Sequence, residues 1–276
     1  MSLRFPRTAL TMLAFSLAAT AYTEEITTTD GQIYISSTIR RSRDMIMVKV
    51  IMEGSTSSVE MGLPLARIAK VNFAEPPELT KAIAAASKGN ATEVLSLTDD
   101  FVSKQGDLKD VPGSWWLEMA RLRLLALASS GKESECADLA RQIGAIKSPT
   151  AESLSKAGTL FAPLATSDLT TVVVEAKALP RLGGDQSSPL ALLALGKALL
   201  QKKDYPAALR AFLTIKVFYP SVALLQPPAL AGAAEAYQGL KDEKRAAQSY
   251  ADIVSDWPDS PQAPMAKKKT EILAHP

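Results

Sequence analysis

The sequence predicts a mainly α-helical protein: an α-solenoid of paired helices, preceded by a small all-β barrel-like domain. After the first 21 residues and up to about residue 73, the hydrophobic residues recur with a period close to two, which is typical of strands. After Glu75-Pro76-Pro77 the period becomes helical, and alanine and leucine dominate. The helices then follow one another in pairs joined by short turns, as in a solenoid. The predicted parts are a signal peptide at 1–21, a β domain at 22–76 and a helical array at 77–276.

Composition limits the possible classes of protein. The chain has 276 residues, of which 47% are hydrophobic, so it can build real cores and is not expected to be disordered. Lys and Arg number 31 against 29 Asp and Glu, a net charge of only +2. Nucleic acid is therefore not an expected partner, because phosphate binding needs a concentrated basic surface.

The first residues have the pattern of a secretory signal. Arg4 and Arg7 form a basic start, residues 9–19 form an apolar run, and Ala19-Thr20-Ala21 offers small residues for cleavage. The run is shorter than the roughly 20 residues that cross a bilayer, so an uncleaved anchor is the less favoured alternative. The lone cysteine, Cys136, lies far from the apolar run, which excludes a lipoprotein. We expect a periplasmic or otherwise exported protein without a stable membrane anchor after cleavage.

Short runs rich in Ile, Val, Thr and Tyr predict about five strands before the diproline. Closing so small a unit into a barrel would remove its exposed edges. The order of strands and turns resembles a small SH3-like or Sm-like barrel over about residues 24–73, but no RNA-binding residues can be carried over from those families. The predicted strands are 25–28, 32–36, 44–52, 57–61 and 67–73.

Apolar residues at helical spacing, interrupted by Gly, Pro, Asn and Asp, predict the helices of the array. Those before residue 180 show the hairpin architecture without a repeat motif. The predicted helices are 79–87, 91–104, 114–129, 133–145, 151–164, 169–179, 189–202, 205–218, 228–240, 244–256 and 261–273.

The last third contains a repeated motif. Residues 189–220 and 227–258 share small, aromatic and proline positions, and about four extra residues lie between the copies, near 221–226. Gly196 is small where two helices should cross closely, and Pro220 stops the second helix. The last helix, 261–273, would cap the array. The matching positions are Leu192, Leu195, Gly196, Leu199, Ala208, Phe212, Ile215 and Pro220 in the first copy, and Leu230, Ala234, Tyr237, Ala246, Tyr250, Ile253 and Pro258 in the second.

This pattern resembles the tetratricopeptide repeat family. The resemblance implies a concave groove that receives a peptide or helix and is lined mainly by the first helix of each repeat. By position, the partner-binding residues would be Lys197, Gln201, Glu235 and Gln238, although an ordinary wet surface explains them equally well.

Motifs for catalysis or metal binding are missing from the sequence. The one histidine is His275, and there is no zinc, nucleophile-elbow or phosphate-loop pattern. Asp99-Asp100 is interpreted as a solvated pair, and Cys136 as a small residue packed between helices. We therefore expect no enzyme activity, no metal and no cofactor.

The sequence favours a non-catalytic scaffold or assembly factor of the bacterial cell envelope that binds a protein or peptide. Two alternatives stay open. Trp115 or Trp116 could hold a cell-wall glycan, although core packing of both rings is favoured. A hydrolase using carboxylates distant in sequence would leave no motif. The sequence does not determine the oligomeric state.

Overall fold

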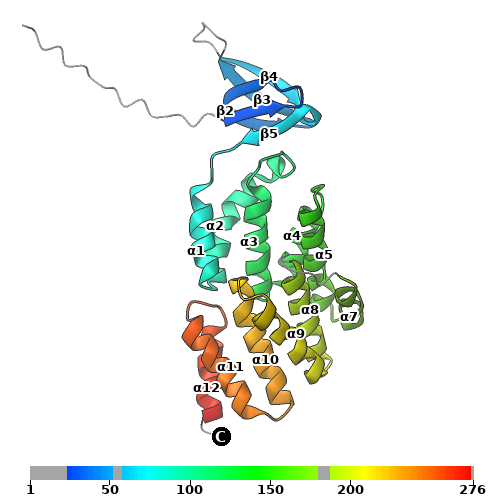
Figure 1. Ribbon diagram of the computed structural model, residues 1–276, viewed down its shortest axis with the longest axis vertical. Coiled ribbons are helices and arrows are strands. Elements are labelled where there is room, and N and C mark those ends of the chain that lie inside the picture. The colour runs from blue at the N-terminus through cyan, green and yellow to red at the C-terminus, as the bar shows by residue number, and fades with distance from the viewer. Residues whose placement is uncertain (1–23, 52–57, 180–186, 275–276) are drawn as a thin grey trace, which may run out of the picture.

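The computed structural model describes residues 24–51, 58–179 and 187–274 (Figure 1). The chain is mainly helical, with a small antiparallel sheet of five strands at its N-terminal end, as predicted. In Figure 1 the sheet lies at one end of the molecule and the helices fill the rest. The predicted signal peptide lies outside the described residues. Within them, no helix combines the length and apolar character needed to cross a bilayer.

The sheet has the strand order β4-β3-β2-β1-β5. Alternating side chains point into one core, so Ile26, Ile46 and Val48 are fully buried. The second strand runs past the predicted end at Ser36, whose buried hydroxyl spans a bulge: it accepts from the Lys49 backbone N–H at 2.8 Å. The strands are β1 (Glu24–Thr28), β2 (Ile33–Ser42), β3 (Met45–Ile51), β4 (Ser58–Pro64) and β5 (Ile68–Asn72).

The sheet is not closed into a barrel, contrary to the prediction, because β4 and β5 are its two edges and do not pair. The connection between the second and third helices covers β5 instead. The Val71 N–H donates to the Pro112 carbonyl at 2.9 Å, and Leu108 and Val111 fill the core of the sheet. A segment of the helical part thus protects one edge, which removes part of the need for closure.

Gly113 allows this close approach, and its substitution tests it. Its φ is +92°, and an added Cβ would overlap the Val71 carbonyl oxygen. Gly31 is a matched control, since its φ is +81° but nothing lies within 4 Å of an added Cβ. We expect Gly113→Ala to lower the free energy of unfolding by at least about 1–3 kcal/mol more than Gly31→Ala, because overlap adds to the backbone strain. Equal losses in urea titrations would contradict the contact.

The helices match the predicted segments closely, and α2 and α9 match at both ends. The predicted helix 151–164 is instead broken at Leu160. In a continuous helix the ring of Pro163 would clash with the carbonyl of Thr159, four residues earlier. The helices are α1 (Pro77–Ser87), α2 (Ala91–Lys104), α3 (Trp116–Ser129), α4 (Glu133–Ile143), α5 (Pro149–Thr159), α6 (Phe161–Ala165), α7 (Leu169–Ala178), α8 (Ser187–Gln201), α9 (Tyr205–Phe218), α10 (Gln226–Gly239), α11 (Glu243–Asp256) and α12 (Ala263–Ala274).

One type of turn recurs in the helical hairpins. In each case a residue with left-handed backbone directly precedes the N-cap residue of the next helix. The N–H of that N-cap residue donates to a carbonyl of the preceding helix. Asp204, for example, donates its N–H to the Leu199 carbonyl at 2.9 Å, while its side chain caps α9. Successive turns of this type lie about 40 residues apart along the chain. The left-handed residues are Gly89, Gly131, Ser167, Lys203 and Lys241.

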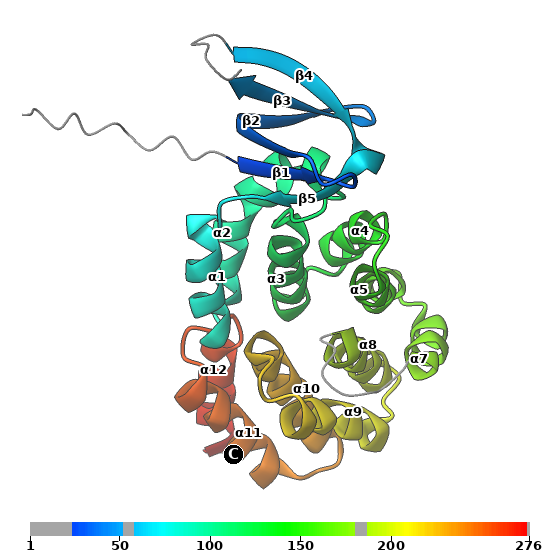
Figure 2. The same ribbon diagram turned by 45° about the horizontal axis from the view of Figure 1, so that its top comes forward.

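The last hairpin returns to the first, and Figure 2 shows α12 beside the end of α1. Gly89, between α1 and α2, lies so close to Trp257 that an added Cβ would be 2.9 Å from the indole. Gln262 Nε2, just before α12, donates to the Ser129 carbonyl at the end of α3 at 2.6 Å. The extra residues between the repeats form a short 3₁₀ turn, Ala223–Leu225, with Leu224 and Leu225 buried in the main core. The row of hairpins is therefore curved back on itself.

Phe212 of α9 holds three helices together. Its ring is 1% exposed and lies against both Gly196 of α8 and Gly232 of α10. A Cβ added at Gly196 would lie 2.5 Å from the ring, and one at Gly232 would lie closer still. The Cε1 and Cζ atoms of the ring are among the nearest atoms to both glycines, so the three helices meet at one edge of Phe212.

We expect Gly196→Ala to destabilise the protein by about 1–3 kcal/mol, because the new methyl group overpacks against Phe212. Gly106→Ala is the control, since nothing lies within 4 Å of its added Cβ. Phe212→Leu should recover part of the loss when combined with Gly196→Ala, and urea titrations of the four proteins would measure this coupling. Strict additivity of the two substitutions would show that the contact does not hold.

Candidate functional site

Three of the four predicted partner-binding residues meet in one hollow. Lys197 and Gln201 come from α8 and Glu235 from α10. The C-terminal end of α3 and the start of α12 close the other side. The hollow measures about 350 Å³. We call it the α3–α8–α10 hollow; its polar lining residues are Ser129, Ser130, Glu133, Lys197, Gln201, Glu235 and Gln262.

Lys197 is already neutralised. Its ammonium lies 2.9 Å from a carboxylate oxygen of Glu133, at the start of α4, and 5.7 Å from the centre of the Phe161 ring. Both side chains of the ion pair are less than one-third exposed, so water screens the pair less than it would at the surface. Lys197 therefore joins α8 to the start of α4 through this ion pair.

Glu235 lies at the mouth of the hollow and, among the described residues, makes no hydrogen bond or ion pair. The surrounding protein raises the pKa of its carboxyl by desolvation, against the opposing effect of Lys269 and Lys197. Glu235 is thus the acidic group of this hollow that has no direct hydrogen-bond or ion-pair partner in the described residues.

Gln238, the fourth predicted residue, does not line the hollow. Its side chain is half-buried, and its Oε1 accepts a hydrogen bond from the Tyr250 hydroxyl at 3.3 Å. Burial raises the pKa of Tyr250 to about 12, so this hydroxyl keeps its proton and remains a donor. The position of Gln238 points to a role in joining α10 to α11.

Sequence reasoning missed the residues that close the hollow: Ser129, Ser130, Glu133 and Gln262. The two serines follow the apolar run 124–128 at the end of α3, which is a local signal that polar side chains gather there. Nothing in the sequence indicates that Gln262 lies against them, because 133 residues separate it from Ser129.

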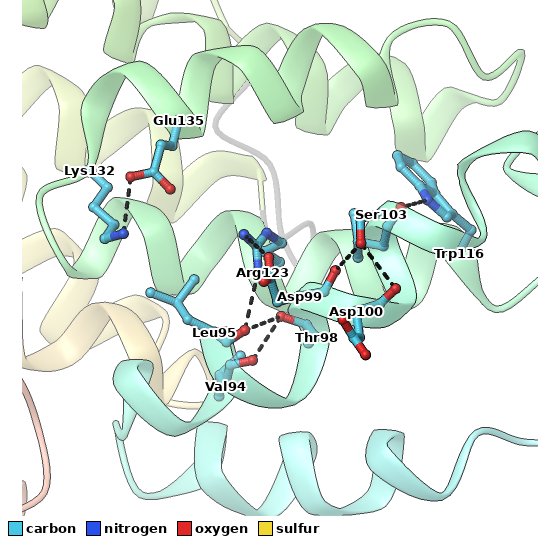
Figure 3. A network of polar contacts seen from close by, with 11 residues as sticks. Val94, Leu95, Thr98, Asp99, Asp100, Ser103, Trp116, Arg123, Lys132 and Glu135 are labelled. Carbon is cyan, nitrogen blue, oxygen red and sulfur yellow. Dashed lines mark hydrogen bonds and ion pairs between the residues drawn. The ribbon is translucent and has the colours of Figure 1, made fainter.

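The two tryptophans have different surroundings. Trp116 is fully buried and donates its indole N–H to the Val102 carbonyl at 2.9 Å (Figure 3). Trp115 is partly exposed and donates to the Phe73 carbonyl at 3.2 Å. It lines a cleft of about 990 Å³ between the sheet and the first helices, together with Phe101 and acidic residues that include Glu78.

The Asp99-Asp100 pair and Cys136 were also candidate groups, and each is now placed by its contacts or its burial. Figure 3 shows Asp99 beside Arg123, and their ion pair measures 2.7 Å; Asp100 pairs with Lys104 instead. The two carboxylates therefore do not form an acid–base couple. Burial raises the pKa of the Cys136 thiol to about 12, which leaves it protonated and unreactive. In the described part of the chain, no group of three or more His, Cys, Asp or Glu residues could hold a metal ion.

Comparisons with known proteins add no assignment. No known protein family matches the chain, and no curated protein matches it either.

Proposed function

We propose that this protein is a non-catalytic interaction scaffold or assembly factor of the bacterial cell envelope, periplasmic or otherwise exported. Its helical part would be a tetratricopeptide-like array, and its sheet a relative of SH3-like domains. The observation that carries the proposal is the α3–α8–α10 hollow, where polar side chains from separate hairpins converge between otherwise apolar helices. Polar groups placed on the inner helices of a repeat array favour recognition of a partner over packing.

The recurring hairpin turn supports the tetratricopeptide-like part of the proposal. It joins α1 to α2, α3 to α4, α6 to α7, α8 to α9 and α10 to α11, so each pair is built by the same local backbone device. Gly196, a small residue of the repeat motif, packs against Phe212 of the paired helix α9, which supports the resemblance. The proposal that the protein is exported rests on the signal pattern in residues 1–21 alone.

The test is crosslinked capture of envelope proteins by the mature chain, compared between two variants. Gln201→Lys with Glu235→Lys changes the charge at the mouth of the hollow, where both side chains are exposed. The control, Gln142→Lys with Glu271→Lys, makes the same charge change at exposed positions outside it. We avoid replacing Lys197 by Glu, because that would place it against Glu133.

We expect the hollow variant to lose most of its captured partner and the control to retain it, at equal protein level and with melting temperatures close to wild type. A partner captured equally by both variants would locate binding elsewhere. No specific partner for any of the proteins would contradict the scaffold function itself.

A second candidate function is glycan binding at the cleft beside the sheet. Trp115 and Phe101 offer rings for stacking on sugars, and the cleft has nearby carboxylates to accept hydroxyl hydrogen bonds. If it operates, Trp115→Ala should reduce sedimentation of the protein with purified peptidoglycan. Phe218→Ala, an aromatic residue that is 73% exposed elsewhere, should leave sedimentation unchanged.

A further inference from the structure

The cleft between the sheet and the first helices has a one-sided charge. Its described lining includes three carboxylates, Glu24, Glu75 and Glu78, and no lysine, arginine or histidine. Basic and acidic residues are nearly balanced in the whole chain, at 31 against 29, so this separation of charge is local. We call it the Trp115 cleft. Its volume of about 990 Å³ is at the upper end of the range for ligand pockets.

Two of the three carboxylates have no partner. Glu24, at the start of β1, and Glu78, in the first turn of α1, make no hydrogen bond or ion pair in the described part of the chain. Glu75 accepts a hydrogen bond from the Thr80 hydroxyl at 3.0 Å. Burial raises the pKa of the Glu24 carboxyl, and no basic side chain opposes this effect. The negative charge of the cleft is therefore not compensated by the residues that the structure describes.

Three aromatic rings line the same cleft. Phe73 follows β5, Phe101 lies on α2 and Trp115 precedes α3, and each is only partly buried. The Trp115 indole N–H donates to the Phe73 carbonyl at 3.2 Å, which restrains the indole ring. The face of an aromatic ring attracts a cation, most strongly in tryptophan. Rings and unpaired carboxylates in one cleft thus favour the same kind of ligand.

The charge of the cleft distinguishes between two occupants. A neutral glycan can stack on the rings and donate hydroxyl hydrogen bonds to the carboxylates, but it leaves the negative charge uncompensated. An arginine side chain supplies a positive charge, and its planar guanidinium both stacks on aromatic rings and donates several hydrogen bonds to carboxylates. Its aliphatic stem can pack on Ile39, a partly buried apolar residue of the wall. Lysine suits the cleft less well, because its ammonium is more strongly hydrated and is not planar.

We propose that the Trp115 cleft binds an arginine side chain of the partner protein, with the guanidinium stacked on Trp115 and paired with Glu24 and Glu78. This inference rests on the proposed interaction function and adds a second contact surface to it. No described residue lines both this cleft and the α3–α8–α10 hollow. Glycan binding at the same cleft is the competing outcome of the test.

Fluorine NMR of Trp115 reports directly on the cleft. The full mature chain is labelled with 5-fluorotryptophan at its three tryptophans, and the Trp115 resonance is identified with Trp115→Phe. The protein is titrated at low salt with the capped pentapeptide Ala-Ala-Arg-Ala-Ala. The same peptide with citrulline removes the charge and keeps a planar end group, whereas the peptide with lysine keeps the charge. The trimer of N-acetylglucosamine represents a neutral glycan.

We expect the arginine peptide to shift the Trp115 resonance with saturation. The citrulline peptide should bind at least about tenfold more weakly, and the lysine peptide about threefold more weakly. Glu24→Gln with Glu78→Gln should weaken arginine binding by about tenfold or more, because it removes both unpaired charges.

The control variant is Glu243→Gln with Glu271→Gln. It makes the same charge change at exposed positions of α11 and α12, which lie at the opposite end of the molecule from the sheet (Figure 1). Arginine binding should be unchanged in this variant, and melting temperatures close to wild type confirm that both double variants are folded.

Equal binding of the arginine and citrulline peptides, or unchanged binding by the Glu24→Gln, Glu78→Gln variant, would overturn the arginine site. Equal binding of the lysine peptide would overturn the assignment to a guanidinium, and tighter binding of the glycan trimer would overturn it in favour of sugar. These measurements do not depend on capture from envelope extract. Failure of the cleft with successful capture would reject only this inference, and arginine binding without any captured partner would reject only the scaffold function.

Discussion

The packing of Phe212 against two glycines is the constraint on which much of the helical part depends. Gly196 and Gly232 have no Cβ, so α8 and α10 can both approach the same aromatic ring closely. Close packing of this kind leaves no space for an additional methyl group. Phe212 also lines the α3–α8–α10 hollow, so the contact that sets the spacing of three helices also forms one wall of the candidate site.

The return of the last hairpin determines what kind of site the inner helices can form. Trp257 lies on the turn between α1 and α2, and Gln262 binds the end of α3. These contacts enclose a hollow of side-chain size, whereas an open superhelix would present a long groove.

The sheet depends on the helical part for its edge and for part of its core. Leu108 and Val111 come from the connection between α2 and α3, and Arg41 of β2 pairs with Asp110 of the same connection. The two parts are thus joined through one short segment, with the Trp115 cleft beside it. A sheet this small gains burial that its own five strands would not supply.

The sequence by itself determined the features that depend on neighbouring residues. The change of hydrophobic period located the strands and helices, and capping residues such as Asp204 located the turns, because both act within a few positions along the chain. The break at Leu160 was equally local and could have been predicted from Pro163. The small residue at Gly196 was recognised from the repeat pattern.

Only the tertiary structure decided how these elements meet. The open sheet with its covered edge, the return of the last hairpin and the pairing of Gln262 with Ser129 all join segments far apart in sequence. Lys197, Gln201 and Glu235 were candidates by position, yet only the folded chain shows that Glu133 neutralises Lys197. Hydrophobic periodicity reports which face of an element is buried but not what lies against it, so partners and charge balance emerge only when the chain is folded.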